Sequence, residues 1–110
     1  MPTPKPGSPV RGSETGRPIM ALLDLLGRRW ALRVMWELRS GPLTFRELRE
    51  RCDGMSPSVL NDRLLELREA DIVEHQEGAG YRLTTEGRAL STALRSLDGW
   101  ARRWAERQGA

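Results

Sequence analysis

The sequence predicts a mainly α-helical domain with one small β-hairpin, an α+β fold. Three observations predict it. Two capped helix starts flank a glycine-containing turn, a hairpin pattern follows directly, and an apolar helix lies on each side of this unit. At 110 residues the chain is long enough for one domain with a modest core. Its 38% hydrophobic and 30% charged residues are typical of a globular protein with a polar surface.

The side-chain chemistry argues against an enzyme and against a metal protein. Cys52 is the only cysteine and His75 the only histidine, so neither an internal disulfide nor a Cys/His metal cluster can form. The sequence has no nucleophile motif, phosphate-binding glycine loop or paired-carboxylate signature. We therefore expect no enzyme activity and no cofactor. Without a membrane-length apolar run, we expect a cytoplasmic protein, associated with the nucleoid if it binds DNA.

Residues 1–17 are expected to form a disordered basic tail. Proline, glycine, serine and threonine dominate this segment, and only Met1 and Val10 are sizeable apolar residues. Such a composition cannot bury enough apolar surface to order the chain. Its basic residues outnumber its single Glu14. Both an inert tail and a weak DNA-following arm are compatible with this pattern.

The ordered domain is expected to occupy residues 18–110 and to begin with an apolar helix. Residues 19–26 read IMALLDLL, in which Asp24 is the only polar residue, and Pro18 can supply the first turn. A helix without a polar face must be covered on both sides. A domain this small covers only one side well, so we expect the other side to meet a second copy of the chain. The predicted interface residues of this helix are Ile19, Met20, Leu22, Leu23 and Leu26.

A second helix is expected over residues 30–39, which read WALRVMWELR. Apolar residues at helical spacing form two lines along it, one through Val34 and Leu38 and one through Leu32 and Trp36. Two apolar lines indicate a central helix that packs on more than one side. The sequence SGP at residues 40–42 ends it.

Residues 44–70 are predicted to form a helix-turn-helix. Thr44 is a good N-cap, and Glu47 lies three residues later, where it completes a capping box. The second helix has Ser56 as its N-cap and Pro57 at the first helical position, where a missing N–H costs nothing. Between the helices, Gly54 lies where a helix end favours a left-handed residue. Two short helices joined by such a turn are the pattern of a helix-turn-helix.

A β-hairpin placed as a wing is expected over residues 72–83, followed by one long helix over about 85–107. Two glycines, Gly78 and Gly80, lie between the strand patterns of the hairpin. Apolar residues of the last helix alternate steps of four and three, which is a short heptad seam. We expect this helix to add Leu94, Leu97, Trp100 and Trp104 to the dimer interface.

Four segments together resemble the HxlR-type winged helix-turn-helix regulators. These are GRRW at 27–30, GPLTFREL at 41–48, MSPSVLNDRLLEL at 55–67 and YRLTTEG at 81–87. The resemblance implies a homodimeric bacterial or archaeal transcription factor. It also implies that the first and last helices build the dimer and that the second helix of the helix-turn-helix enters the DNA major groove.

The sequence departs from the sensing chemistry of this family at one place. Some members sense oxidants or electrophiles through a cysteine just before the first helix, and residues 16–17 carry none here. Cys52 lies elsewhere, near the end of the helix before the turn, and we expect it to be a buried, unreactive thiol.

The second helix of the helix-turn-helix supplies the predicted base-reading face. With Leu60 and Leu64 toward the core, the rotation of about 100° per residue points Ser58 and Asp62 outward and leaves Asn61 at the flank. Ser58 and Asn61 can contact base edges, and Asp62 can accept a hydrogen bond from cytosine. The other predicted DNA contacts, mainly to phosphates, are Thr44, Arg46, Ser56, Pro57, Arg63, Gly78, Gly80 and Arg82.

The leading hypothesis is a sequence-specific regulator that binds double-stranded DNA as a homodimer at an inverted-repeat operator. The net charge of +3 and a pI of about 10.0 favour a polyanionic partner. Residues 56–71, however, hold two arginines against four carboxylates. This acidic helix favours an alternative, a protein-interaction module without specific DNA binding. A further alternative is a regulator with an unidentified small-molecule effector in a dimer-interface pocket near Trp36, Trp100 and Trp104.

Overall fold

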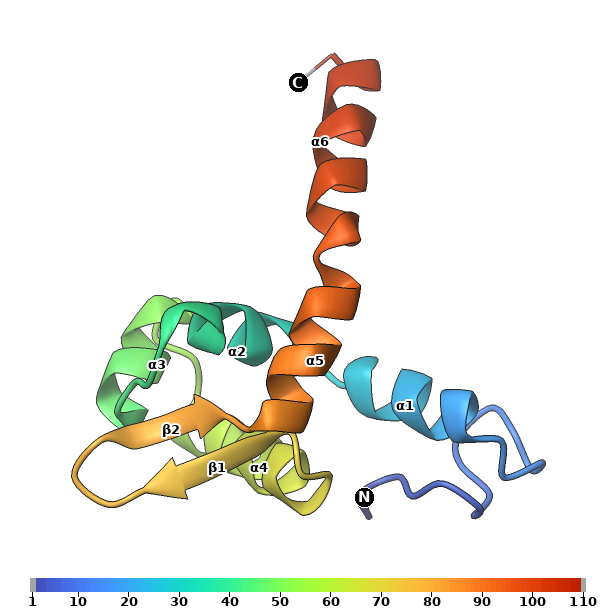
Figure 1. The fold of residues 1–110 in the computed structure, drawn as a ribbon, viewed down its shortest axis with the longest axis horizontal. Coiled ribbons are helices and arrows are strands. Elements are labelled where there is room, and N and C mark those ends of the chain that lie inside the picture. Colours follow the sequence, from blue (N-terminus) through green and yellow to red (C-terminus); the bar gives the residue numbers. More distant parts are fainter. Residues whose placement is uncertain (1, 110) are drawn as a thin grey trace.

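The computed structural model describes residues 2–109 and confirms the predicted fold class. Figure 1 shows a group of helices with one small hairpin at its edge, and the last helix projecting away from the rest. In chain order the elements are α1 (Pro18–Leu26), α2 (Ala31–Glu37), the 3-10 turn η1 (Leu38–Ser40), α3 (Phe45–Arg51), α4 (Pro57–Glu69), β1 (Val73–Gln76), β2 (Gly80–Leu83), α5 (Thr85–Leu94) and α6 (Ser96–Arg107). No helix in the described range has the length and apolarity needed to span a lipid bilayer.

The predicted helix starts of the helix-turn-helix are confirmed by their hydrogen bonds. The Thr44 hydroxyl accepts from the Glu47 N–H at 3.1 Å, and the Thr44 N–H donates to the Glu47 carboxylate at 2.9 Å. The bond from the Thr44 N–H also lowers the pKa of Glu47. Ser56 caps α4 by accepting from the Val59 N–H, with Pro57 in the first turn. Gly54 has the predicted left-handed backbone, with φ of 70°.

The core lies between α2, α3, α4 and the hairpin. Its most fully buried side chains are Val34, Leu38, Leu48, Cys52, Leu60, Leu64 and Leu67. The predicted helix at residues 30–39 is shorter than expected. Trp30 adopts a left-handed φ of 74°, so the helix begins at Ala31, and its last turn tightens into η1. The Trp30 ring is half-buried against the core, as expected.

The hairpin is attached to the helix-turn-helix by a third backbone segment. β1 and β2 pair antiparallel, with Val73 opposite Leu83 and Glu74 opposite Arg82. Leu43, just before α3, exchanges two backbone hydrogen bonds with Tyr81, at 2.8 and 2.9 Å. A Cβ at Gly80 would lie 2.4 Å from the Leu43 carbonyl oxygen. Gly80 is therefore required by this close backbone approach, which fixes the hairpin beside α3.

The prediction of one unbroken C-terminal helix is wrong, because α5 and α6 are separated at Arg95. At the break the Arg95 N–H donates to the Thr92 carbonyl, a shorter-range bond than that of an α-helix. The Thr92 hydroxyl also donates to the Arg88 carbonyl at 3.0 Å, and such back-bonding bends helices. Beyond the break, no residue of α6 is buried.

Helix α1 has one side buried in the domain and one side exposed, whereas the sequence predicted a helix that is apolar all round. Ile19 and Leu23 lie on its open side, each 54% exposed. Leu26 belongs to the core cluster, so its predicted place in an interface is wrong. Asp24 is buried on the inner side, where a guanidinium from the N-terminal segment compensates its charge: the Arg11 Nε lies 3.6 Å from the carboxylate.

The N-terminal segment folds into turns beside α1. A bridge joins Val10 to Ser13, and the Gly7 N–H donates to the Gly16 carbonyl at 2.9 Å. The predicted disorder of this tail stays a prediction.

Candidate nucleic-acid interface

One face of α4 is exposed to solvent, and it is the face that the sequence predicted. Ser58, Asn61 and Asp62 are exposed, whereas Leu60 and Leu64 are buried behind them. This confirms the predicted rotation of the helix. Leu65, at 50% exposed, continues the open face by one turn and adds an apolar surface to it.

The start of α4 adds polar groups to this face. The Ser56 and Ser58 hydroxyls lie 3.0 Å apart, and both residues are exposed. The first backbone N–H groups of a helix have no partner within the helix, so this end favours an anion such as a phosphate. Pro57, also exposed, lacks an N–H and contributes shape only.

Helix α3 contributes one strongly exposed cation next to the start of α4. The Arg46 side chain is 89% exposed, and the Glu50 side chain, its ion-pair partner at 3.3 Å, is 67% exposed. Exposed pairs of this kind contribute little to stability, so the guanidinium can exchange Glu50 for a phosphate. Together with Phe45, Gly54 and Pro57, Arg46 lines a hollow of about 400 Å³ between α3 and α4. The Thr44 hydroxyl is occupied by its helix cap.

Other arginines around the turn of the helix-turn-helix form hydrogen bonds within the chain and stabilise its fold. The Arg49 Nε donates to the Met55 carbonyl at 2.8 Å and so holds the turn. Arg33 donates to Glu37 at 2.8 Å and to the Arg51 carbonyl at 2.6 Å. The hydrogen bond with Glu37 raises the pKa of Arg33.

The wing carries its arginine on a strand and not at its tip. Arg82 lies opposite Glu74 in the hairpin, and its Nε donates to the Glu74 carboxylate at 2.7 Å. The tip, residues 77–79, holds Gly78 at φ of 83° and no basic residue. Arg82 therefore presents a guanidinium whose charge is already compensated.

Arg63 and Glu66 form a partly buried ion cluster under α4, where the sequence predicted a phosphate contact for Arg63. Arg63 is only 18% exposed, with its Nε 2.9 Å from the Glu66 carboxylate. The same carboxylate receives the Arg28 guanidinium, from the turn between α1 and α2. Arg63 also donates to the Arg29 carbonyl at 3.4 Å. These contacts oppose a phosphate-binding role for Arg63 and fix α4 to the α1–α2 turn.

Exposed apolar side chains gather on α1 and α6, as the dimer hypothesis requires. Ile19, Leu23 and Leu97 are each more than half exposed. Trp100 and Trp104, each 49% exposed, stack on one another with ring centroids 5.9 Å apart. The other predicted interface residues are half-buried within the chain: Met20, Leu22 and Leu94.

Cys52 is fully buried, which confirms its predicted burial. Burial raises the pKa of its thiol, and the reactive thiolate is disfavoured. No group of three His, Cys, Asp or Glu side chains among residues 2–109 is arranged to hold a metal ion.

Native Cys52 is expected to resist alkylation. With iodoacetamide near pH 8, we expect labelling to be far slower in the native protein than in guanidinium-unfolded protein, because the thiol must first be exposed by opening of the core. Mass spectrometry of timed samples measures this. Equal labelling rates in both states would contradict the buried placement.

Comparison with known proteins agrees with this geometry. The model of the HxlR-like helix-turn-helix family matches residues 25–109. The HTH-type transcriptional regulator YodB of Bacillus subtilis is 34% identical over 89 residues, which cover 76% of this chain and 80% of YodB. The crystal structure of quinone-bound YodB superimposes with a TM-score of 0.71 and 34% identity over 77% of this chain and 96% of that one.

A second solved structure shows the same likeness. A possible HxlR family transcriptional factor from Thermoplasma volcanium GSS1 superimposes with a TM-score of 0.71 at 25% identity, covering 81% of this chain and 85% of that one. The family model spans most of the domain, from the last residues of α1 through α6. The chain therefore belongs to the HxlR-like helix-turn-helix family of DNA-binding transcriptional regulators.

Proposed function

We propose that this regulator binds double-stranded DNA sequence-specifically, as a homodimer on an inverted-repeat operator. The observation that carries the proposal is the open face of α4, where Ser58, Asn61 and Asp62 stand exposed on a helix held rigidly from behind. An α-helix of this kind fits the DNA major groove, and amide and hydroxyl side chains read base edges there. The family is one of transcriptional regulators, which points away from an enzyme.

Each exposed group has a distinct role in the proposed complex. Asn61 pairs with adenine, Ser58 contacts a neighbouring base, and Leu65 lies against a thymine methyl group. Arg46 and the start of α4 contact phosphates, which set the register without reading sequence. Arg82 and Gly78 place the wing against the flanking backbone. In a symmetric dimer the two α4 helices read half-sites about 34–36 Å apart.

Asn61→Ala is expected to weaken binding to the cognate site by about 1–3 kcal/mol, and binding to random DNA much less, because it removes a base contact. Fluorescence-polarisation titration against the chain's own upstream DNA measures both. Arg46→Ala is the comparison. It should weaken both DNAs alike and reduce the log–log salt slope by about one, because it removes a phosphate contact.

The alternative, a protein-interaction module, has one observation in its favour. Within residues 56–71, Asp62, Glu69 and Asp71 are exposed, and Arg68 is the only exposed arginine. If Asn61→Ala and Arg46→Ala both bind the upstream DNA as the wild type does, the major-groove placement is wrong and this alternative is favoured. Asp62→Asn provides a further check, since removing a repelled charge should raise affinity for random DNA.

The proposed dimer explains why α6 projects from the domain (Figure 1) and why its apolar side chains are uncovered. Contiguous exposed apolar surface of this kind marks an association site. Trp100→Glu is expected to shift the protein from dimer to monomer at micromolar concentration, because it places a charge in that contact. Analytical ultracentrifugation measures the change.

Trp100→Phe is the matched control and should remain dimeric, because it keeps an apolar aromatic ring at this position. A wild-type protein that sediments as a monomer at micromolar concentration would contradict the dimer. A Trp100→Glu variant that sediments as a dimer would place the interface elsewhere.

A further inference from the structure

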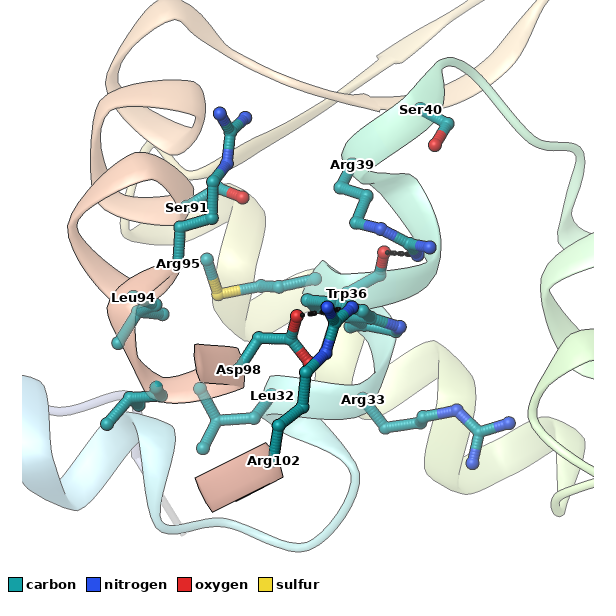
Figure 2. A pocket seen from close by; sticks show the side chains of 12 residues that line it. Leu32, Arg33, Trp36, Arg39, Ser40, Ser91, Leu94, Arg95, Asp98 and Arg102 are labelled. Atoms are coloured by element: carbon teal, nitrogen blue, oxygen red, sulfur yellow. Dashed lines mark hydrogen bonds and ion pairs between the residues drawn. The ribbon is translucent and has the colours of Figure 1, made fainter. Parts of the chain in front are cut away.

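A groove of about 730 Å³ runs between α2 and the α5–α6 junction (Figure 2). Its apolar floor consists of Leu32, Met35 and Trp36 on one side and Leu94 and Leu97 on the other. Leu32 and Trp36 remain 44% and 42% exposed, so the chain itself does not cover them. The volume lies in the range of about 300–1,000 Å³ that small-molecule sites occupy. The sequence predicted a pocket near Trp36, Trp100 and Trp104, but only Trp36 lines this groove.

The rim of the groove carries a surplus of positive charge. Four arginines line it against one carboxylate, Asp98, which leaves a net charge of +3 (4 − 1). Two of the four have carboxylate partners: Arg33 pairs with Glu37, and Arg102 pairs with Asp98 at 3.0 Å.

The two remaining rim arginines lack a carboxylate partner in the described part of the chain. Arg39 stacks over the Trp36 ring, 3.9 Å from its centroid, and donates to the Trp36 carbonyl at 2.9 Å. Arg95 lies across the groove at the junction of α5 and α6 (Figure 2). Neither guanidinium lies within ion-pair distance of an Asp or Glu among residues 2–109. Figure 2 shows the two guanidiniums directed apart, with Arg39 held over Trp36, so an anion in the groove would meet one uncompensated guanidinium at a time.

We propose that this groove is an effector site for a small aromatic carboxylate. Its ring packs against Leu32, Trp36 and Leu97, and its carboxylate accepts hydrogen bonds from one of the two uncompensated guanidiniums, Arg39 or Arg95. Guanidinium groups suit this ligand because their planar fork matches the two oxygens of a carboxylate. A purely apolar ligand would form no hydrogen bond with Arg39 or Arg95, and the positive charge of the two guanidiniums would repel a cation.

A second copy of the chain is a poorer occupant on grounds of charge. Helix α6 holds three arginines against Asp98 and Glu106. Insertion of another α6 would bring these arginines toward Arg39 and Arg95, and like charges at close range are destabilising. Of the predicted interface residues, Leu94 and Leu97 line the groove and the stacked Trp100 and Trp104 do not, so the proposal requires a dimer contact through the two tryptophans that leaves Leu94 and Leu97 uncovered.

The position of the groove gives the ligand a regulatory role. Helix α2 packs on both α3 and α4, and Arg95 marks the break between α5 and α6. A ligand held by both sides favours one angle of α6 relative to the DNA-reading helices, and a ligand shifts an equilibrium only through such differential contacts. This consequence rests on the proposed function, whereas ligand binding itself does not.

The test compares 6-fluoro-2-naphthoate with the neutral 6-fluoro-2-naphthamide, titrated against the full chain without DNA and followed by fluorine NMR. The naphthoate is expected to bind about tenfold or more tightly than the amide, since it alone makes charge-assisted hydrogen bonds. The double variant Arg39→Gln/Arg95→Gln should remove this preference. The matched control Arg68→Gln/Arg103→Gln, with the same charge change outside the groove, should retain it.

Three results would overturn the proposal. They are equal affinity for naphthoate and naphthamide, an unchanged preference in the Arg39→Gln/Arg95→Gln variant, and failure of the wild type to bind the naphthoate. Binding that appears only in the monomeric Trp100→Glu variant would assign the groove to a second copy of the chain. Because these titrations contain no DNA, a protein that fails the DNA titrations can still pass them, and the two failures are distinguishable.

Discussion

Gly87→Ala is expected to lower the free energy of unfolding by about 3 kcal/mol or more, at the upper end of overpacking effects. Gly87 lies in the first turn of α5, where an added Cβ would be 2.0 Å from the Ile72 carbonyl oxygen and 3.3 Å from the Leu83 Cβ. The obstructing atom belongs to the backbone, so no side-chain rotation can relieve the contact. Equilibrium urea unfolding of the variant and the wild type measures the difference.

The backbone around Gly87 is also held in place by Thr84. The Thr84 hydroxyl accepts from the Gly87 N–H at 2.9 Å and donates to the Asp71 carbonyl at 2.6 Å. Moving α5 to make room for a methyl group would break this helix cap and its link to the end of α4. The large expected effect therefore combines overlap with the loss of hydrogen bonds.

Gly99→Ala is the matched control, because Gly99 lies inside α6 where an added Cβ meets only the end of the Arg103 side chain, at 3.5 Å. Alanine favours a helix interior over glycine by up to about 1 kcal/mol, so this variant should be as stable as the wild type or slightly more stable. If both alanine variants unfold at the same urea concentration, the close approach of α5 to Ile72 is wrong.

Glu66→Ala is expected to destabilise the protein by about 3–5 kcal/mol, the usual cost of removing one partner of a buried ion pair. The Glu66 carboxylate lies between the guanidiniums of Arg28 and Arg63, and all three side chains are largely withdrawn from water. Without the carboxylate, two positive charges face each other under α4. Thermal and urea unfolding measure the loss.

Glu69→Ala, three residues further along the same helix, is the control for Glu66. Glu69 is exposed, so its removal should change stability by less than about 0.5 kcal/mol. A Glu66→Ala variant as stable as Glu69→Ala would show that the cluster contributes nothing to the folded state. A fully folded Glu66→Ala variant that loses only DNA affinity would instead limit the cluster to orienting α4.

The features that the sequence predicted correctly depend on residues close together in the chain. Thr44 and Glu47 form their capping box within one turn, and Ser56 with Pro57 starts α4 in the same local way. The buried and open faces of α4 follow from its helical repeat alone. Local rules of this kind need no knowledge of the tertiary fold.

The features that the sequence did not predict depend on distant partners. Glu66 finds Arg28, which is 38 positions away, and that contact turns a helix flank into a buried site. Arg82 meets Glu74 through the hairpin register, and Leu26 joins the core through packing of α1. The break at Arg95 reflects a competition between backbone and Thr92 hydrogen bonds, which the heptad pattern does not reveal.

In the proposed dimer, the uncovered α6 would also determine how the regulator responds to its own abundance. No residue of this helix is buried within the chain, so in the proposed dimer its order depends on the partner. Assembly of this kind follows mass action, and the fraction of dimer falls as the protein is diluted. At low copy number the operator-binding species therefore grows with the square of the chain concentration. A modest change in synthesis or degradation of the protein would then alter promoter occupancy more than proportionally.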